Sequence, residues 1–375
     1  MMRDDLHGRT EYETPDDGNS DGTETLDRWL ERLLAAGGSD LLLVPGSPVC
    51  ATVQGSVRRI GLELLDSAAI ETTVIPALST HALKQYRESG IADSSYRRGR
   101  LGRFRINIHK EKGQTAAAIR ALPAQVPVFE RLHLPPSVKA LASLSRGLVL
   151  IGGPAGSGKS TTLAALVNEI NAHHARHIVI IEDPIEYEHA HEQSVVEQVE
   201  IGTDAPDFPS ALRGALRQAP DVIVVGEMRD PETMRIAVAA AETGHLVLST
   251  IHTTDVATTV SRISDSFPVE RQPNIRQELA ICLAAVLTQI LLPSKDGSGR
   301  YPAAELLMVG YGARQHIRRN QLQHLHQEIA LTKKKGSFPL EDSLVHLIRA
   351  GHITKEDAAL CALHPDDLEI MLAMS

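Results

Sequence analysis

Continuous apolar segments alternate with helical stretches through the second half of the chain. They are rich in Val, Ile and Leu and comprise LVLIGG (148–153), HIVIIED (177–183), DVIVVGE (221–227), HLVLSTIHT (245–253) and AAELLMV (303–309). Runs of this kind are typical of strands buried on both faces, and helices between them predict a parallel α/β sheet. The apolar run at 280–292 is too short to cross a bilayer and predicts a buried helix. A helical region over 310–375 closes the chain.

Shorter apolar segments, separated by polar residues, make up the first half of the chain. Leu26 begins an amphipathic helical pattern that ends at Gly37–Gly38. Short alternating segments follow, then a helical stretch near 66–88, and then two strands within 102–122 that meet in a turn at Gly113. The pattern predicts a small α+β domain over residues 25–122.

Composition marks the limits of the two domains. Residues 1–24 are acidic, rich in Thr, Gly and Asp and poor in aliphatic side chains, so we expect a disordered acidic tail. Prolines gather in 123–136, which predicts a linker. Residues 137–375 then form the second domain, with the helical region at its end.

Net charge and cysteine usage exclude some functions for this chain. The 375 residues carry a net charge of −9, whereas a dedicated nucleic-acid binder shows a basic surface. The three cysteines are far apart and form no C-x-x-C pair, which argues against a disulfide framework or a zinc site and suits a reducing compartment. No apolar secretory segment follows the first Met. We expect a cytoplasmic protein, with attachment to a membrane machine through a protein partner left open.

The most specific motif is GPAGSGKS at 153–160, a complete G-x-x-x-x-G-K-[ST] phosphate loop. Its glycines let successive backbone N–H groups point at phosphate oxygens. Lys159 places a charge against the β- and γ-phosphates, and Ser160 offers its hydroxyl to Mg²⁺. A helical pattern follows directly, and a helix N-terminus favours anions. The residues expected to bind ATP are Gly153, Pro154, Ala155, Gly156, Ser157, Gly158, Lys159, Ser160 and Thr161.

Acidic residues follow two of the predicted strands, where a phosphate loop needs partners for Mg²⁺ and for the attacking water. Glu227 ends DVIVVGE at the position of a Walker B acid. An ordinary Walker B has Asp where this chain has Gly226, so Glu227 is expected to hold Mg²⁺ largely alone, through water. Glu182, Asp183 and Glu186 follow the strand at 177–181, and one of them is expected to be the general base.

Histidines flank another strand. His245 and His252 stand at the two ends of HLVLSTIH, where a histidine can sense γ-phosphate charge or be purely structural. Other histidines lack ligand spacing with carboxylate support, and we do not expect them to bind a metal. They are His173, His174, His177, His316, His324 and His326.

Arginines lie on the paired strands of the small domain. Arg103, Arg105 and Arg120 are either solvated or reach the phosphates of a nucleotide from a second domain, as arginine fingers do. The run Lys333–Lys335 is expected to be a solvated loop.

Four segments in order resemble the boxes of the secretion ATPase superfamily, most closely its pilus retraction ATPases of the PilT/PilU type. GGPAGSGKSTT, IEDPIEYEH, APDVIVVGEMRDPET and AAETGHLVLSTIHTT are similar to the Walker A, Asp, Walker B and His boxes, and the resemblance covers about residues 25–365. It implies a PAS-like N-terminal domain joined to a RecA-like ATPase core. It also implies a homo-hexamer with nucleotide at domain and subunit boundaries, working with an inner-membrane platform protein.

The resemblance also assigns roles. Glu186 takes the general-base position and Glu227 the Walker B position, while His245 and His252 take the His-box positions. Arg105 and Arg120 match positions whose counterparts contact phosphate.

Missing and altered motifs place the chain within the superfamily. The four-cysteine zinc insert of assembly and type II secretion ATPases is absent from the sequence. The retraction motif AIRNLIRE is altered to GARQHIRR at 312–319, and GASDLH appears as GGSDLL at 37–42. The expected function is a hexameric ATP-hydrolysing motor that retracts a type IV pilus, without nucleic acid. The alternatives are an accessory paralogue, a conjugation or secretion ATPase, and a regulatory subunit that binds ATP without hydrolysing it.

Overall fold

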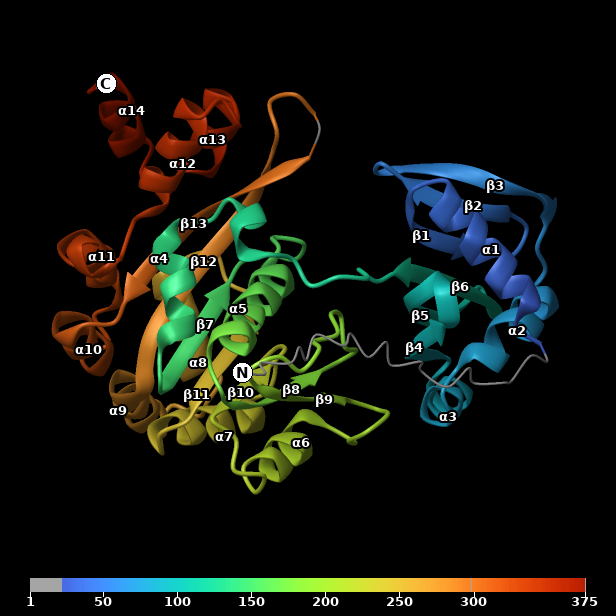
Figure 1. Cartoon of the computed structure of the whole chain (residues 1–375), viewed down its shortest axis with the longest axis horizontal. Helices are drawn as coiled ribbons and strands as arrows, with labels where there is room; N and C mark the ends of the chain where they lie inside the picture. Colours follow the sequence, from blue (N-terminus) through green and yellow to red (C-terminus); the bar gives the residue numbers. More distant parts are fainter. Residues whose placement is uncertain (1–21, 298, 375) are drawn as a thin grey trace, which may run out of the picture. The chain divides into compact units, whose positions relative to one another are not determined.

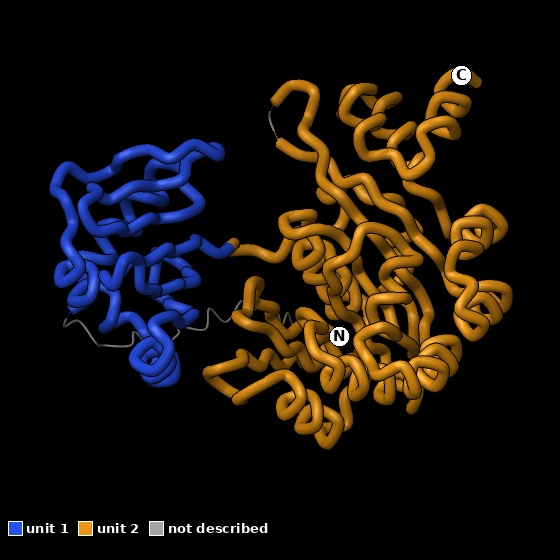
Figure 2. Tube along the Cα trace, turned by 180° about the vertical axis from the view of Figure 1, so that it is seen from behind, with its two compact units in different colours: residues 1–122 blue, residues 123–375 orange. Residues whose placement is uncertain are grey.

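The computed structural model describes residues 22–297 and 299–374. The chain divides into two compact units, residues 1–122 and 123–375, which Figure 2 draws in blue and orange. The predicted acidic tail lies outside the described residues as far as residue 21. In the part of the chain that is described, no helix combines the length and apolar character needed to span a bilayer.

Unit 1 is a six-stranded antiparallel sheet with helices packed on one face (Figure 1). The strand order is β3-β2-β1-β6-β5-β4. Its helices and strands are α1 (Glu24–Ala35), β1 (Gly38–Leu43), β2 (Pro48–Val53), β3 (Ser56–Leu64), α2 (Ser67–Val74), α3 (Thr80–Ser89), β4 (Ile91–Arg98), β5 (Gly102–Glu111) and β6 (Gln114–Ala121). This architecture agrees with the predicted α+β class, to which the structure adds the strand β4.

Alternation along β5 explains which face of this sheet is buried. Phe104, Ile106 and Ile108 are fully buried against the helices. Successive strand residues point to opposite faces, so Arg105 lies on the face away from the helices. In the pairing of β5 with β6, Arg105 stands directly opposite Arg120. The two arginines expected from the sequence are therefore neighbours on one open sheet face.

Unit 2 is built on a seven-stranded sheet of order β13-β12-β7-β11-β10-β8-β9. The strands are β7 (Gly147–Gly152), β8 (His177–Glu182), β9 (Val195–Glu200), β10 (Val222–Val225), β11 (Leu246–Ile251), β12 (Leu283–Pro293) and β13 (Arg300–Met308). The helices are α4 (Pro136–Lys139), α5 (Lys159–His173), α6 (Phe208–Ala215), α7 (Pro231–Glu242), α8 (Val256–Asp265), α9 (Gln272–Cys282), α10 (Tyr311–Arg318), α11 (Leu325–Leu331), α12 (Leu340–Arg349), α13 (Lys355–Cys361) and α14 (Pro365–Ala373).

Both faces of this sheet are covered, as the continuous apolar runs predict. One core packs α5 and the 129–142 segment against strand residues such as Val149 and Ile180. The other packs α6 to α11 against the alternate residues of the same strands, such as Leu150 and Ile181. Figure 1 shows the helices distributed over the sheet in this way. The predicted α/β class is confirmed.

The helix expected over 280–292 is wrong. Helix α9 ends at Cys282, and Leu283 begins β12, which pairs with β7 on one side and β13 on the other. A strand buried on both faces has the same continuous apolar pattern as a buried helix, so periodicity could not distinguish them. The sheet is also not wholly parallel, because β13 runs antiparallel to β12.

The chain ends in α12, α13 and α14, which form a smaller core against the ends of β12 and β13. Leu292 and Ala303 of the sheet contribute to it together with Leu344 of α12 and Leu368 of α14. The helical region expected after residue 310 is confirmed.

Candidate active site

The candidate site lies where the parallel strands of unit 2 end. Register places Gly152 of β7 opposite Ile251 of β11, and Val225 of β10 opposite Ser249 of β11. The carboxyl ends of β7, β8, β10 and β11 therefore meet at one edge of the sheet. In an α/β sheet the ligand lies at this edge. The phosphate loop, Glu186, Glu227 and His252 all follow these strands.

The loop between β7 and α5 has the backbone of a phosphate cradle. Gly153, Gly156 and Gly158 have φ values of 151°, 73° and 88°, which L-residues rarely adopt. A Cβ on Gly153 would lie 2.3 Å from Ser157 Oγ and 2.5 Å from Gln289 O, so this position excludes any side chain. The buried Ser157 hydroxyl has no hydrogen-bond partner among the described residues. These features fit the phosphates of a nucleotide.

Besides glycines, a phosphate loop requires a lysine. Lys159 occupies that position and is 7% exposed. Its ammonium group donates to Gly153 O and Pro154 O, both at 2.9 Å, and to His252 Nδ1 at 3.4 Å. Burial lowers the pKa of Lys159, and the nearby charges of Glu227 and Glu186 oppose that shift. Both predicted carboxylates are thus within electrostatic reach of the loop lysine.

His252 connects Lys159 to Glu227. Its Nε2 lies 3.2 Å from Glu227 Oε1. A lysine ammonium only donates, so Nδ1 must accept and the imidazole proton must be on Nε2, facing the carboxylate. The other oxygen of Glu227 is 2.8 Å from Arg229 Nη2. Lys159, His252 and Glu227 therefore form one continuous polar chain across three strand ends.

Glu186 is positioned by its neighbours on both sides. The hydroxyl of Tyr187 hydrogen-bonds to Thr161 Oγ1 of α5 at 3.1 Å, and Tyr187 O accepts from Gln198 Nε2 at 2.8 Å. The backbone N–H of Ile185 donates to Glu200 Oε2 at 3.1 Å. The bond from Tyr187 to α5 places Glu186 beside the phosphate loop. Tyr187 was not predicted from the sequence, although it follows Glu186 directly.

The Walker B strand ends in glycine for a steric reason. A Cβ on Gly226 would lie 3.2 Å from Ile181 O and 3.2 Å from Glu182 Cγ on the neighbouring strand β8. An aspartate at this position would require β8 to shift by a few tenths of an ångström, and the acid comes one residue later, as Glu227.

Gln289 of β12 is a further part of the site that sequence reasoning missed. Its side chain is 2% exposed and donates to Ser157 O at 2.6 Å. It also accepts from the Thr162 hydroxyl at 2.9 Å. One amide thereby ties the phosphate loop to the first turn of α5. The apolar pattern of 280–292 fits a buried helix as well as a strand, so no sequence pattern pointed to this residue.

We expect Gln289→Leu to loosen the loop. The change leaves a buried carbonyl and a buried hydroxyl without partners, which costs about 2 kcal/mol of unfolding free energy, and it raises the dissociation constant for nucleotide. Urea unfolding and titration with a fluorescent ATP analogue measure the two effects.

Gln272→Leu is the matched control, since Gln272 Nε2 also donates to a backbone carbonyl, Phe267 O, at 3.1 Å, but on α9. It should leave nucleotide affinity unchanged. Equal affinity in Gln289→Leu and the wild type would contradict the role given to Gln289.

The structure does not bring His245 to this group. His245 precedes β11, at the opposite end of that strand from His252, and a six-residue strand spans about 20 Å. Its Nδ1 is 2.9 Å from Ala240 O, at the end of α7. Of the two predicted histidines, His252 is the one that lies at the phosphate loop of its own chain.

Arg105 and Arg120 are each paired with an aspartate inside unit 1. Arg105 Nε is 3.0 Å from Asp93 Oδ1, and Arg120 Nε is 2.7 Å from Asp40 Oδ1. Both pairs are partly exposed. Such pairs contribute at most about 1 kcal/mol to stability, so an anion can replace the aspartate at small cost.

Comparisons with known proteins agree with this geometry. A family model described as type II/IV secretion system protein matches residues 129–337, more than half of the chain. A twitching motility protein of Neisseria gonorrhoeae is 40% identical over 306 residues, which are 82% of this chain and 82% of that protein.

Two further matches are to PilT proteins. PilT of Pseudomonas aeruginosa, named a type IV pilus retraction ATPase, is 38% identical over 331 residues, covering 88% of this chain and 96% of that one. A crystal structure of the pilus retraction motor PilT with bound ADP superposes with a TM-score of 0.82 at 39% identity, covering 91% of this chain and 98% of that one. The chain belongs to the type II/IV secretion system protein family and is an ATPase of the PilT type.

Proposed function

We propose that this protein is a hexameric, Mg²⁺-dependent ATP-hydrolysing motor that retracts a type IV pilus. The observation that carries the proposal is the polar chain Lys159–His252–Glu227 beside a complete phosphate loop. A loop that only bound nucleotide would need no such chain. The similarity to retraction ATPases over most of the chain supports pilus retraction as the work that the motor performs.

The residues divide the chemistry among them. The loop residues 153–161 bind the phosphates, and Ser160 and Glu227 would hold Mg²⁺, Glu227 through water. The ion would supply positive charge against the phosphates. Glu186 orients the attacking water and accepts its proton. Its position next to Tyr187, which is bonded to α5, supports this role.

The contact between Lys159 and His252 can respond to binding of the γ-phosphate. The three ammonium protons of Lys159 have three partners: Gly153 O, Pro154 O and His252 Nδ1. Phosphate oxygens must therefore replace at least one of them. Loss of the His252 contact frees Nδ1 and breaks the polar chain from Lys159 to Glu227.

The arginines of unit 1 complete the site. Arg105 and Arg120 exchange their aspartate partners for phosphate oxygens when unit 1 of a subunit closes over nucleotide. Their adjacency on one open sheet face supports a shared anion. Hydrolysis and release then return each arginine to its aspartate, and the two units rotate relative to each other.

We place the motor on the cytoplasmic side of the inner membrane, held there by the platform protein of the pilus machine. The work is transmitted through that partner and through six copies of this chain.

Deletion of the gene tests the direction of work. We expect excess surface pili and loss of twitching, restored by the wild-type gene and not by one encoding Lys159→Ala. Loss of pili would instead indicate an assembly motor. Normal pili with failed secretion or conjugation would indicate a transfer-system ATPase, and either result would overturn the proposal.

A further inference from the structure

Two histidines and a carboxylate meet in the C-terminal part of the chain. They are far from the phosphate loop in sequence and have no part in the proposed ATPase chemistry. His326 lies on α11, His364 is the residue before α14, and Asp367 is in the first turn of α14. One ligand atom from each lies within 4.8 Å of the other two. Within residues 22–297 and 299–374 this is the single group of three such side chains that is close enough to share an ion. The sequence spacing argued against a metal at His326, because its partners His364 and Asp367 lie far from it in the chain.

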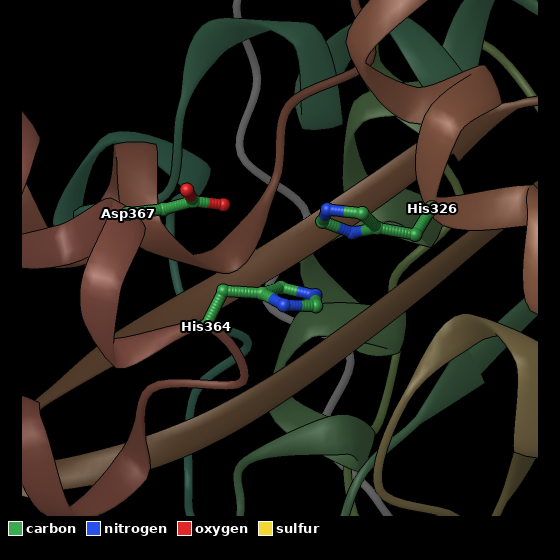
Figure 3. A group of neighbouring side chains, drawn as sticks. All are labelled: His326, His364 and Asp367. Carbon is green, nitrogen blue, oxygen red and sulfur yellow. The ribbon is translucent and has the colours of Figure 1, made fainter.

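The side chains are directed toward one another. Figure 3 shows the two rings facing, with the Asp367 carboxylate pointing toward the ring of His326. The ring centroids of His326 and His364 are 4.0 Å apart and the planes are inclined by 39°. Both histidines are partly buried, and Asp367 is exposed.

Charge around the rings favours a cation. His326 and His364 line a cavity of about 220 Å³ together with Asp255 and Glu305. Burial raises the pKa of Glu305 to about 7, so Asp255 is the residue that supplies negative charge in this lining. Asp367 adds a carboxylate beside the rings, and none of the residues that line the cavity is Lys or Arg. The volume is ample for an ion and its waters, since one water occupies about 30 Å³.

The donor types also suit a metal, because imidazole nitrogens and carboxylate oxygens are ligands that Zn²⁺ takes in proteins. The backbone N–H of His364 donates to Glu341 Oε1 at 2.8 Å, which fixes the residue that carries the second ring.

We propose that His326, His364 and Asp367 bind one divalent transition-metal ion, with Zn²⁺ the best fit. Two imidazole nitrogens and one carboxylate oxygen with a water in the fourth position are a common zinc set. Tetrahedral zinc with bonds of about 2.0–2.2 Å places ligand atoms about 3.3 Å apart. The three groups reach that spacing from 4.8 Å through side-chain torsions, because the terminal torsions of His and Asp are soft.

The ion would fasten α14 to α11. Helix α14 buries Leu368 and packs Met371 and Leu372 partly against the same core, while its Ile370 is exposed. Ligands from both helices on one ion add a link that is independent of that packing. Metal occupancy then determines how firmly the end of the chain is docked.

The test uses the full-length protein without nucleotide, stripped with a chelator and then dialysed free of it. Zn²⁺ is titrated against a chromophoric chelator, and Co²⁺ is added separately to read d–d absorption. We expect one equivalent of Zn²⁺ to bind the wild type. His326→Gln, His364→Gln and Asp367→Asn should each weaken Zn²⁺ binding by about tenfold or more and abolish the Co²⁺ absorption.

His324→Gln is the matched control. The rings of His324 and His316 are also close, with centroids 5.2 Å apart, but they belong to no three-ligand group. It should bind Zn²⁺ as the wild type does. Circular dichroism and thermal melting in chelator check that every variant folds, and the three single changes keep the test decisive if one of them does not. His364 makes no side-chain cap bond to α14, so its replacement removes no cap.

Hydrogen exchange gives a second readout. Zn²⁺ should slow exchange of the amides of 365–373 in the wild type and leave it unchanged in His326→Gln. Failure of the wild type to bind Zn²⁺ more tightly than the three ligand variants would overturn the proposal. None of these results depends on ATP turnover, so they are separate from the test of the motor.

Discussion

Replacement of Lys159 by alanine should reduce ATP turnover by about 10²–10³-fold or more. The lysine is nearly buried, and its three donors face the loop carbonyls and His252, where the β- and γ-phosphates are expected. Removing it deletes the positive charge against the transferred phosphate and also breaks the chain to Glu227. Steady-state phosphate release and titration with a fluorescent ATP analogue measure the loss.

Lys139→Ala is the control for this change. Lys139 is a partly exposed lysine of the same unit, with Nζ 2.5 Å from Glu130 Oε1, outside the phosphate loop. Its replacement should leave turnover unchanged. If Lys159→Ala turned ATP over at the wild-type rate, nucleotide chemistry would have to be placed elsewhere in the chain.

Glu186→Ala should separate binding from hydrolysis. We expect nucleotide affinity close to that of the wild type and turnover lower by about 10²–10⁴-fold, the usual contribution of a general base. The side chain acts on water and lies on a segment that the Tyr187–Thr161 hydrogen bond holds beside the loop. Binding is measured with the fluorescent analogue, and hydrolysis by phosphate release from saturating ATP.

Glu188→Ala is the paired variant for Glu186. Glu188 is an exposed acid on the same loop, two residues further on. Its loss should change neither binding nor turnover. Equal turnover in Glu186→Ala and the wild type would remove Glu186 as the base and leave Glu182 or Asp183 as candidates.

Residues that act through their neighbours in the chain could be predicted from sequence. The phosphate loop needs glycines, Lys159 and a following helix within one short segment, and all of these are visible there. The strand runs ending at Glu227 and His252 were equally visible, because a strand buried on both faces is continuously apolar. The parallel order of β7, β8, β10 and β11 then brings their ends together.

Residues that act across long separations could not be predicted. Gln289 reaches Ser157 from 132 residues away, on a strand whose pattern fits a buried helix equally well. The tight contact of Gly226 is with β8, which a linear pattern does not contain. His326 meets His364 and Asp367 only because α11 and α14 pack near the same cavity. Strand β11 separates His245 from His252, so the role of His245 stays a prediction.

The rate at which the purified protein hydrolyses Mg-ATP on its own is the most direct test of the central claim, that this site hydrolyses ATP to drive a motor. The account predicts steady turnover well above that of Lys159→Ala measured in parallel. Turnover no higher than that of Lys159→Ala, with hydrolysis appearing only when a related ATPase is added, would contradict it and indicate a regulatory subunit.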